Sequence, residues 1–468
     1  MEAKKKGNFS SSLGFVFAAA GSAVGVGNVW RFPYLAARDG GGLFLLIYLI
    51  LVLTFGFTLL TTDIALGRRT GKNAWHAFGS IHPRWGWLGK LTFLVPVLIM
   101  TYYSVLGGWI LKYTTVYFTG QSSAAAQDNF FTSFISSPVS PIVFMLLFLC
   151  LCAVVVYMGV EEGIEKFSKF VMPALLLIII GVAVYSLTLC HTDASGNVRS
   201  GLEGLKMYLV PNLEGLTFSR FLSILLDAMS QLFFSLSVSM GIMITYGSYV
   251  KKDVNLNKSI CQIEFFDTGV ALLAGAMIIP AVYVFVGIDG MTQGPSLMFV
   301  SLPKVFSSMG TAGVLLGAAF FVMILFAALT SCVSILETLV ATCMDIFHTN
   351  RKTVSLVIAA LAAVASVVIC LGYNIFYFNL TLPNGSPAQL LDLVDYISNS
   401  LLMPLISLFT CLFIGWVIGP KWIDQEMEVG GTKFKRKKLY AFMIRWPAPI
   451  IMAVLFLQST GLMRVLFA

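Results

Sequence analysis

Charged residues are scarce in this sequence. They account for 11% of its 468 residues, whereas a soluble globular domain usually carries about 25%. Hydrophobic residues account for 58%. The apolar stretches, such as 43–66 and 354–371, approach or exceed the roughly 20 residues that a helix needs to cross a bilayer. They are too long and too evenly apolar for the strands of a membrane barrel. We therefore expect an all-α integral membrane protein.

Paired cysteines and clustered metal ligands are missing as well. The eight cysteines lie within or at the ends of apolar stretches, which is not the pattern of a disulfide framework or a zinc site. The histidines lie at or near expected loops, and none has the spacing of a metal site or a catalytic triad: His76, His82, His191 and His348. The sequence therefore predicts no catalytic residues and no enzyme activity.

The net charge of +8 has a simpler explanation than nucleic-acid binding. Most of the 30 lysines and arginines fall in the connecting segments on the same side as the N-terminus, for example Arg68, Arg69 and the basic run 433–438. This asymmetry predicts a cytoplasmic N-terminus in a multi-pass protein. The short termini favour a bacterial inner membrane.

Eleven apolar spans are predicted along the chain. They cover about 14–37, 42–67, 87–118, 141–158, 166–190, 219–249, 260–287, 311–347, 353–371, 390–418 and 440–463. The largest outer connections are 119–140, 191–218, 288–310 and 372–389, and the third of these has room for a short helix that packs back onto the protein. No long linker divides the chain, so 1–468 is expected to form a single transmembrane domain.

Two of the spans are expected to be broken near the middle of the membrane. The first contains three glycines and two polar residues in the stretch 20–28, and the sixth contains three serines and a glycine in 233–241. Glycine costs about 1 kcal/mol relative to alanine inside a helix. Unwound backbone is tolerated at that depth only where it lines a cavity or is buried in protein. Two broken spans five apart suggest two inverted repeats of five helices.

Such breaks suit a zwitterion and a cation. The N-terminus of a half-helix offers free amide donors and a positive dipole to a carboxylate. Carbonyl groups at the other half-helix suit a cation or an ammonium group. The alternative is that the small residues only allow close helix packing.

Three motifs resemble those of the neurotransmitter:sodium symporter family. They are the run 25–34 (GVGNVWRFPY), the run 231–237 (QLFFSLS) and the triplet 329–331 (LTS), and the resemblance extends over about 6–419. It implies a LeuT-like fold of about 11 transmembrane helices with broken helices 1 and 6. Repeat one would cover about 10–190, repeat two about 219–419, and an extra helix about 440–463. The implied activity is sodium-coupled symport of an amino acid by alternating access.

The resemblance also implies two sodium sites built from oxygen ligands, which hard cations prefer. The first would comprise Ala23, Asn28, Ser235 and Asp267, and the second Gly21, Val24, Ala327, Thr330 and Ser331. One bacterial member of the family has asparagine at the place of Asp267, and another resembles this chain there. Chloride-dependent relatives have serine at the place of Ala271, near Tyr48 and Gln231. We expect the Asp267 carboxylate to supply the missing negative charge, so that transport does not need chloride.

The implied substrate is a hydrophobic, bulky or aromatic amino acid. The residues expected to bind it are Ser22, Ala23, Gly25, Val26, Gly27, Ile99, Tyr103, Phe234, Ser235, Ser237, Met240, Ser331 and Ile335. Monoamine transporters of the family have aspartate at the place of Ser22, where it pairs with the amine. An amine without a carboxylate would leave the amide donors unpaired, at a cost of about 1–3 kcal/mol. Met240 adds a flexible wall that suits aromatic side chains.

Charged residues within spans are candidates for gates. Arg31 and Asp395 resemble the outer pair of the family, and Tyr103 and Phe234 resemble the aromatic lid beneath it. Lys6 and Asp345, with Tyr249 nearby, resemble the inner latch.

Three other features of the spans are candidates for a structural or gating role. Asp63 and Glu337 could brace the broken segments through hydrogen bonds or have a plain structural role. Span five contains Gly163 and Pro173, a spacing that accompanies unwinding of its inner end in relatives.

Two other functions fit a membrane protein with a ligand site. Broken helices could line an amino-acid-gated channel, and a sensor could bind an amino acid without moving it. Concentrative, saturable uptake would distinguish a carrier from both. The oligomeric state does not follow from the sequence.

Overall fold

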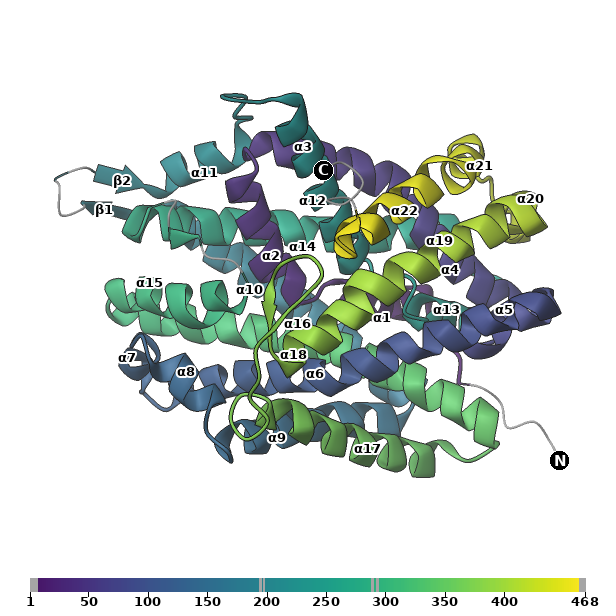
Figure 1. Ribbon diagram of the computed structural model, residues 1–468, viewed down its shortest axis with the longest axis horizontal. Helices are drawn as coiled ribbons and strands as arrows, with labels where there is room; N and C mark the ends of the chain where they lie inside the picture. Colours follow the sequence, from purple (N-terminus) through teal and green to yellow (C-terminus); the bar gives the residue numbers. More distant parts are fainter. Residues whose placement is uncertain (1–6, 193–195, 197, 288–289, 292–293, 463–468) are drawn as a thin grey trace.

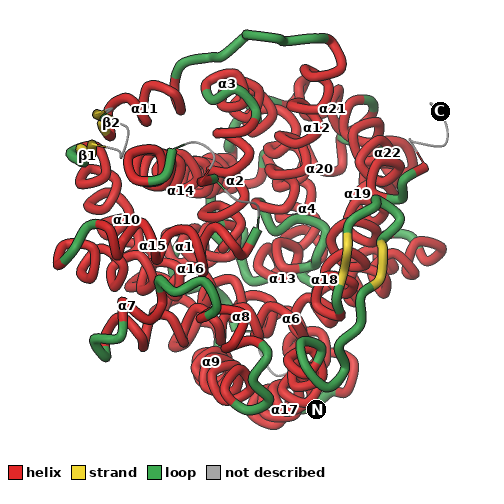
Figure 2. The backbone as a smooth tube through the Cα atoms, turned by 60° about the vertical axis from the view of Figure 1, so that its left-hand side comes forward, coloured by secondary structure: helices red, strands yellow, loops and turns green. Residues whose placement is uncertain are grey.

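A computed structural model of the protein describes residues 7–192, 196, 198–287, 290–291 and 294–462. Long helices run roughly along the horizontal direction of Figure 1. The helices α7, α8 and α15 and the β1–β2 hairpin lie at its left end, and α5 and α20 lie at its right end. Figure 2, turned by 60°, shows that helix dominates the backbone and that the two pairs of short strands lie at the edge of the bundle.

The helices divide into two series at about the middle of the chain. The first comprises α1 (Ser12–Ala23), α2 (Val26–Arg38), α3 (Gly42–Leu51), α4 (Phe57–Thr70), α5 (Ala74–Ile81), α6 (Gly86–Phe118), α7 (Ser122–Ala125), α8 (Phe130–Ile135), α9 (Ser140–Met158), α10 (Lys166–Leu187) and α11 (Gly201–Leu209). The second comprises α12 (Phe218–Ser235), α13 (Ile242–Ser248), α14 (Leu256–Phe285), α15 (Leu302–Ser308), α16 (Thr311–Phe347), α17 (Arg351–Leu371), α18 (Leu390–Asp395), α19 (Met403–Leu412), α20 (Lys421–Met427), α21 (Lys437–Arg445) and α22 (Pro447–Ser459).

Several of the long helices contain π-helical turns, and two small hairpins complete the fold. The π-helical segments are Val52–Gly56, Val160–Glu165, Leu297–Ser301, Tyr396–Leu402 and Phe413–Ile418. The antiparallel hairpins join β1 (Cys190–Thr192) to β2 (Val198–Ser200) and β3 (Leu380–Thr381) to β4 (Pro387–Ala388). The short helix expected within 288–310 is present as α15 with the π-helical turn before it.

Each predicted span corresponds to one helix, or to helices in series, in the structure. Within the described residues, nine helices are long and apolar enough to cross a membrane, and the bent pair α1–α2 makes ten. The remaining predicted span corresponds to α12 and α13, which six non-helical residues separate. In the most apolar 18 residues of α9, only 33% are buried inside the protein. An apolar surface of this kind is suited to contact with lipid.

The first helix breaks at Val24 and Gly25, as the glycines predicted. Val24 has φ −68° and ψ 94°, Gly25 has φ −118° and ψ −175°, and the two half-helices are bent by 55° relative to each other. The bend leaves the last carbonyls of α1 and the first amides of α2 without helical partners. Because α1 is buried over most of its length, these groups face protein and not lipid.

The second break is held by a buried carboxylate from α4. Ser237 and Ser239 have φ values of 53° and 62°, and Gly241 has 78°, so three residues adopt the left-handed region. The amide of Ser239 donates a hydrogen bond of 2.8 Å to Oδ2 of Asp63, which is 3% exposed. Asp63 therefore braces this broken segment through a hydrogen bond, which is one of the two alternatives that the sequence offers for it.

Helices α4 and α13 approach each other through a reciprocal pair of glycines. A β-carbon at Gly67 would collide with the backbone carbonyl of Ile244, and one at Gly247 would collide with the carbonyl of Ile64. The two glycines thus occupy equivalent places on the facing helices. This close contact fixes α13, and with it the inner end of the second break, against α4.

We predict that Gly67→Ala destabilises the protein by about 1–3 kcal/mol, because the added methyl group has to separate two backbones. The measurement is the thermal unfolding midpoint in detergent. Gly181→Ala in α10 is the control, since no atom lies within 4 Å of the new β-carbon. The control is expected to be neutral or to stabilise by up to about 1 kcal/mol. Equal midpoints for the two variants would contradict the close contact.

Candidate functional site

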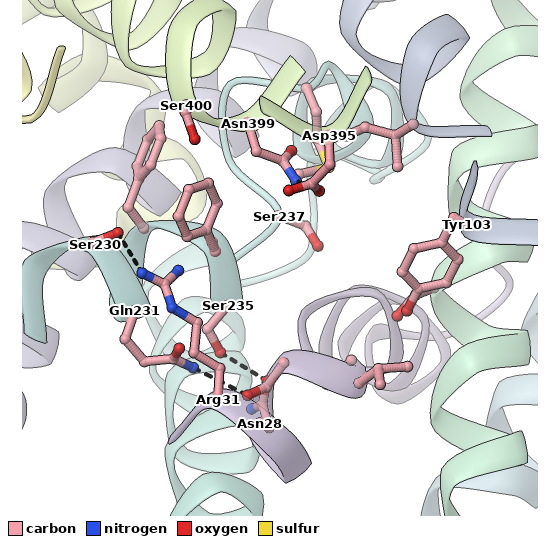
Figure 3. A pocket seen from close by; sticks show the side chains of 18 of the residues that line it. Asn28, Arg31, Tyr103, Ser230, Gln231, Ser235, Ser237, Asp395, Asn399 and Ser400 are labelled. Carbon is pink, nitrogen blue, oxygen red and sulfur yellow. Dashed lines mark hydrogen bonds between the residues drawn. The ribbon is translucent and has the colours of Figure 1, made fainter. Parts of the chain in front are cut away.

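A cavity of about 650 Å³ lies beside both helix breaks. It is lined by residues from α1, α2, α6, α12, α16 and the segment between α12 and α13, and it extends to Asp395 and Asn384 near the β3–β4 hairpin. Figure 3 shows polar side chains from these elements around the cavity. All thirteen residues predicted to bind substrate line it: Ser22, Ala23, Gly25, Val26, Gly27, Ile99, Tyr103, Phe234, Ser235, Ser237, Met240, Ser331 and Ile335.

The residues of the first predicted sodium site lie together at one side of the cavity. Oδ1 of Asp267 on α14 accepts hydrogen bonds from Nδ2 of Asn28 at 2.8 Å and from Oγ of Ser235 at 2.7 Å. The Ser235 hydroxyl also lies 3.1 Å from Oδ1 of Asn28. Asp267 is fully buried. Ala23, which ends α1, also lines the cavity.

Several buried polar atoms at this place have no partner within the described part of the chain. They include Oδ2 of Asp267, Oε1 of Gln231 and the hydroxyl of Tyr48. A buried acceptor without a partner is costly, and a fully buried carboxylate with only neutral donors more so. The residues therefore fit a cation that oxygen atoms would coordinate.

The second predicted sodium set also converges. The hydroxyl of Ser331 lies 3.5 Å from the carbonyl oxygen of Gly21 and 3.4 Å from that of Val24. The hydroxyl of Thr330 lies 3.0 Å from the carbonyl oxygen of Ala327. The Ser331 hydroxyl thus meets the last turn of α1, where the break has freed carbonyl groups. The Thr330 hydroxyl bonds within α16, and its side chain packs beside Gly21, where a β-carbon would lie 3.1 Å from that of Thr330.

The amide end of the first break faces a tyrosine. Gly25 precedes α2 and has no side chain to cap the helix. A β-carbon built there would lie 3.4 Å from Oγ of Ser331 and 3.5 Å from the hydroxyl of Tyr103. The space in front of the first amides of α2 is therefore bounded by two hydroxyl groups. A helix N-terminus of this kind favours a negatively charged group.

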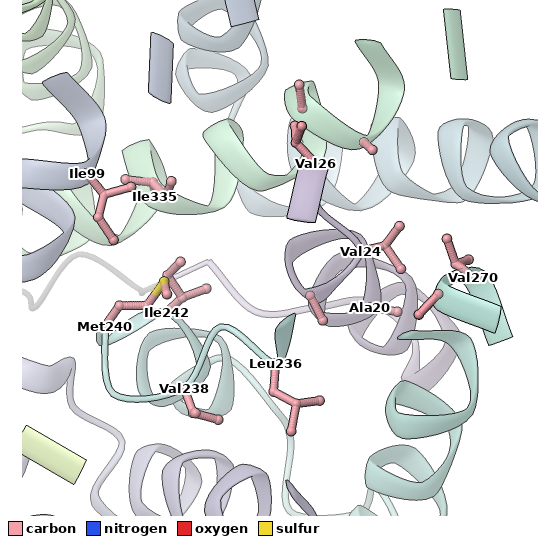
Figure 4. Close-up of a cluster of buried hydrophobic side chains, with 14 of the residues drawn as sticks. Ala20, Val24, Val26, Ile99, Leu236, Val238, Met240, Ile242, Val270 and Ile335 are labelled. Carbon is pink, nitrogen blue, oxygen red and sulfur yellow. The ribbon is translucent and has the colours of Figure 1, made fainter. Parts of the chain in front are cut away.

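Hydroxyl groups also connect the two breaks. Oγ of Ser237 donates to the carbonyl of Ser22 at 2.8 Å, and Oγ of Ser22 donates to Oγ of Ser237 at 3.2 Å. The apolar wall of the cavity lies nearby. Figure 4 shows a cluster of buried hydrophobic side chains, and its labelled members that line the cavity are Val26, Ile99, Met240, Ile242 and Ile335.

The predicted outer gate residues both line the cavity but have partners on their own sides. Arg31 donates to the hydroxyl of Ser230 at 2.9 Å, and its guanidinium lies 4.8 Å from the ring centre of Phe234. Oδ1 of Asp395 accepts from Asn399 at 2.6 Å. Figure 3 shows Arg31 and Asp395 as separate side chains of this cavity. The guanidinium is therefore held against α12.

The structure describes only part of the predicted inner latch. Lys6 lies outside the described residues, and Nδ2 of Asn73 donates to Oδ2 of Asp345 at 2.6 Å. The hydroxyl of Tyr249 donates to Oε1 of Glu337 at 2.7 Å, and Arg351 donates to both oxygens of that carboxylate. Glu337 therefore ties the end of α13 to the start of α17.

Some residues of the site were missed by the sequence analysis. Asn399 lies four residues after Asp395, so its helical spacing could have identified it. Ser230 likewise lies one turn before Phe234. Asp227 lines the cavity and forms an ion pair with Arg38. The cavity also includes Gln458 and Ser459 of α22, for which the sequence has no signal.

Comparisons with known proteins agree on one family. The model of the Sodium:neurotransmitter symporter family matches residues 6–137 and 133–466. An uncharacterized sodium-dependent transporter of Bacillus subtilis, YhdH, is 34% identical over 99% of this chain and 100% of its own length. Another, of Haemophilus influenzae, is 32% identical over 97% of this chain and 98% of its own.

A solved structure is similar over nearly the whole chain. The crystal structure of MhsT in complex with L-phenylalanine superimposes with a TM-score of 0.83 at 34% identity, and the match covers 97% of this chain and 100% of that one. A family match over both halves of the chain, together with this structural match, shows that the chain belongs to the sodium:neurotransmitter symporter family and is a multi-pass, sodium-coupled membrane transporter of a small molecule and not an enzyme.

Proposed function

We propose that the protein is a symporter that couples entry of sodium to uptake of a bulky hydrophobic amino acid by alternating access. The proposal rests on one observation, namely that three features lie together at the cavity beside the α1–α2 break. They are two groups of oxygen atoms, the free amides at the start of α2, and an apolar wall. A sodium ion needs the oxygen atoms, and a zwitterion with a large apolar side chain needs the other two.

Sodium enters this proposal as a transported substrate at two sites. The first would use Asn28, Ser235, Asp267 and the carbonyl of Ala23, with the substrate carboxylate completing the shell. The unpaired Oδ2 of Asp267 supports this assignment. Since this ion would contact the substrate directly, the binding of one would favour the binding of the other.

The second sodium would bind between α1 and α16. The carbonyls of Gly21, Val24 and Ala327 and the hydroxyls of Thr330 and Ser331 would hold it. This assignment is supported by the short distances from these carbonyl oxygens to the hydroxyls of Ser331 and Thr330. Because the ligands come from two separate helices, the ion would hold α1 against α16, and its departure would free α1 to move.

The amino acid would lie across the break of the first helix. Its carboxylate would accept hydrogen bonds from the amides at the start of α2 and from Tyr103. Its ammonium group would donate to carbonyls near Ala23 and Phe234 and to the hydroxyl of Ser237. The absence of an acidic side chain at Ser22 supports a substrate with its own carboxylate.

The apolar wall supports a large side chain such as that of Trp, Tyr, Phe or Leu. Met240 and Ile242 follow the second break, and Ile99 and Ile335 come from α6 and α16. MhsT was crystallised with L-phenylalanine, which is consistent with this class. Discrimination between apolar side chains is worth only about 1–3 kcal/mol per methylene group, so several amino acids are expected to compete.

Closure of the gates would alternate access to the cavity. Arg31 would leave Ser230 and approach Asp395 above the rings of Tyr103 and Phe234. The inner latch of Lys6 and Asp345 would then open. We propose an inner membrane location with a cytoplasmic N-terminus, and repeats that cover about 10–190 and 219–419, followed by the extra helix at about 440–463.

The first prediction concerns transport itself. Proteoliposomes with an inward Na⁺ gradient are expected to accumulate labelled tryptophan, tyrosine or leucine above the external concentration, and liposomes with K⁺ on both sides are not. Flux that equilibrates without accumulation would favour a channel. Tight, Na⁺-dependent binding without flux would favour a sensor, and either result would contradict symport.

The second prediction concerns the second sodium site. Ser331→Ala removes one proposed ligand, so the Na⁺ concentration for half-maximal uptake is expected to rise roughly tenfold, equivalent to about 1.4 kcal/mol. Ser334→Ala on the same helix is the control, because its hydroxyl contacts Tyr246 and the carbonyl of Thr330, away from α1. An unchanged Na⁺ dependence in Ser331→Ala would remove this residue from the site.

The third prediction concerns chloride. Asp267 is fully buried beside Ala271, which offers no hydroxyl group to an anion. Replacement of external and internal chloride by gluconate is therefore expected to leave the initial uptake rate unchanged. A loss of uptake that chloride restores would contradict the proposal that the Asp267 carboxylate supplies the negative charge.

A further inference from the structure

The segment between α20 and α21 turns its side chains alternately toward the protein and away from it. Phe434 is buried and packs against the rings of Phe57 and Tyr440, with ring centres 6.1 and 5.8 Å apart. Lys433 and Lys435, on either side of it, are exposed. Burial of the phenylalanine therefore fixes the segment and leaves both lysines on the surface.

The carboxylates beside this segment already have cationic partners. Both α20 and α21 lie at the right of Figure 1, and Lys437 of α21 pairs with Asp424 and Glu428 at 3.5 and 3.3 Å. Arg436 lies 3.5 Å from Oε2 of Glu264 on α14. Two of the cations in the run 433–438 are therefore compensated by acidic side chains.

The other three cations of the run have no acidic partner. The remaining carboxylate of α20, Glu426, pairs with Arg68 at 2.6 Å. Lys433, Lys435 and Lys438 are exposed, and none of them forms an ion pair with another residue in the part of the chain that the structure describes. The end of the bundle at α20 and α21 thus has three uncompensated positive charges close together in sequence.

An apolar stripe continues from Lys438 along α21 and α22, which form one candidate span. Phe442, Trp446 and Ile450 follow at intervals of four residues and are 59%, 52% and 59% exposed. A spacing of four keeps residues on one face of a helix. The ring of Trp416 packs against that of Trp446 with centres 4.8 Å apart and is also half-exposed. The stripe therefore has charge at one end and apolar groups along its length.

We propose that Lys433, Lys435 and Lys438, together with the stripe 442–450, bind an anionic phospholipid. The lysines contact the phosphate group, and an acyl chain lies along the stripe. Clusters of basic residues next to a membrane helix attract anionic headgroups. With the cytoplasmic N-terminus proposed above, this lipid belongs to the inner leaflet.

Two features favour a lipid over a soluble anion. Tryptophan is enriched where the headgroups meet the hydrocarbon, and Trp416 and Trp446 lie just beyond the lysines along the span. A soluble anion would also leave the apolar stripe without a role. The net charge of the headgroup matters as well, because phosphatidylcholine pairs its phosphate with its own cation and phosphatidylglycerol does not.

The test is quenching of tryptophan fluorescence by brominated lipid in the full-length protein. The purified protein is reconstituted in phosphatidylcholine with a minor fraction of phosphatidylglycerol, and the bromine is placed on one lipid or on the other. In the wild-type protein, brominated phosphatidylglycerol is expected to quench far more than its share of the lipid. Trp416→Phe combined with Trp446→Phe should remove this excess, which assigns it to the stripe.

Replacement of the three lysines tests the headgroup site. In Lys433→Gln, Lys435→Gln, Lys438→Gln, the preference for phosphatidylglycerol at the stripe is expected to fall roughly tenfold. The same three changes to arginine should retain it, because the charge is kept. All three side chains are exposed, so neither variant removes a buried contact.

The matched control removes three exposed lysines elsewhere. Lys72→Gln, Lys90→Gln, Lys352→Gln changes the net charge by the same amount at α4, α6 and α17, away from the stripe. The preference for phosphatidylglycerol should match that of the wild-type protein in this variant. An equal loss in both triple variants would show general attraction to a basic surface and would contradict a defined site.

Two other results would overturn the proposal. An unchanged preference after replacement of the three lysines by glutamine would show that they do not bind the headgroup. Loss of the preference in inorganic phosphate, but not in chloride of the same ionic strength, would show a site for a soluble anion. Because the assay requires no transport, absence of uptake by the wild-type protein would count against the proposed function and leave this test intact.

Discussion

The structure depends on the rule that a polar backbone group in the middle of a membrane needs a partner. A continuous helix pairs these groups within itself, but the two helix breaks leave some of them unpaired. Side chains from other segments form hydrogen bonds with most of the unpaired groups. Asp63 accepts the amide of Ser239, Ser237 donates to the carbonyl of Ser22, and Ser331 lies beside the carbonyl of Val24. The free amides and carbonyls that are left at the first break match a carboxylate and a cation.

The buried carboxylates fall into two groups by their partners. Glu165, Glu337 and Glu426 each pair with a lysine or an arginine. Asp63 and Asp267 accept hydrogen bonds only from neutral groups within the described part of the chain. Of these two, Asp267 is the one with a buried oxygen that has no partner there. A fully buried carboxylate in a neutral setting is strongly unfavourable. A sodium ion at this place would provide the positive charge that the paired carboxylates receive from protein.

Local chemistry predicted much of the fold and the site. Glycines and serines in the wrong place for a helix located both breaks, and the substrate and sodium residues that resemble those of the family come together around one cavity or directly behind it. The bracing role of Asp63 follows from the sequence as one of two alternatives, because an acid within an apolar span needs a donor.

Contacts between distant segments could not be predicted in the same way. The sequence does not reveal that Tyr249 bonds to Glu337, that Arg31 rests against Ser230, or that α22 reaches the cavity. Each depends on how helices far apart in the chain pack, and no local pattern encodes that. The contact of Glu165 with Ser10 and Ser11 is hidden for the same reason, since these two serines are about 155 residues away.

The central claim is that one sodium ion and the amino acid share a site and contact each other. Equilibrium binding of radioactive sodium and of labelled tryptophan to the purified protein tests it most directly, each measured over a range of concentrations of the other. The account predicts that saturating tryptophan tightens sodium binding and that sodium tightens tryptophan binding by the same factor. Affinities that do not depend on the other ligand would contradict a shared site.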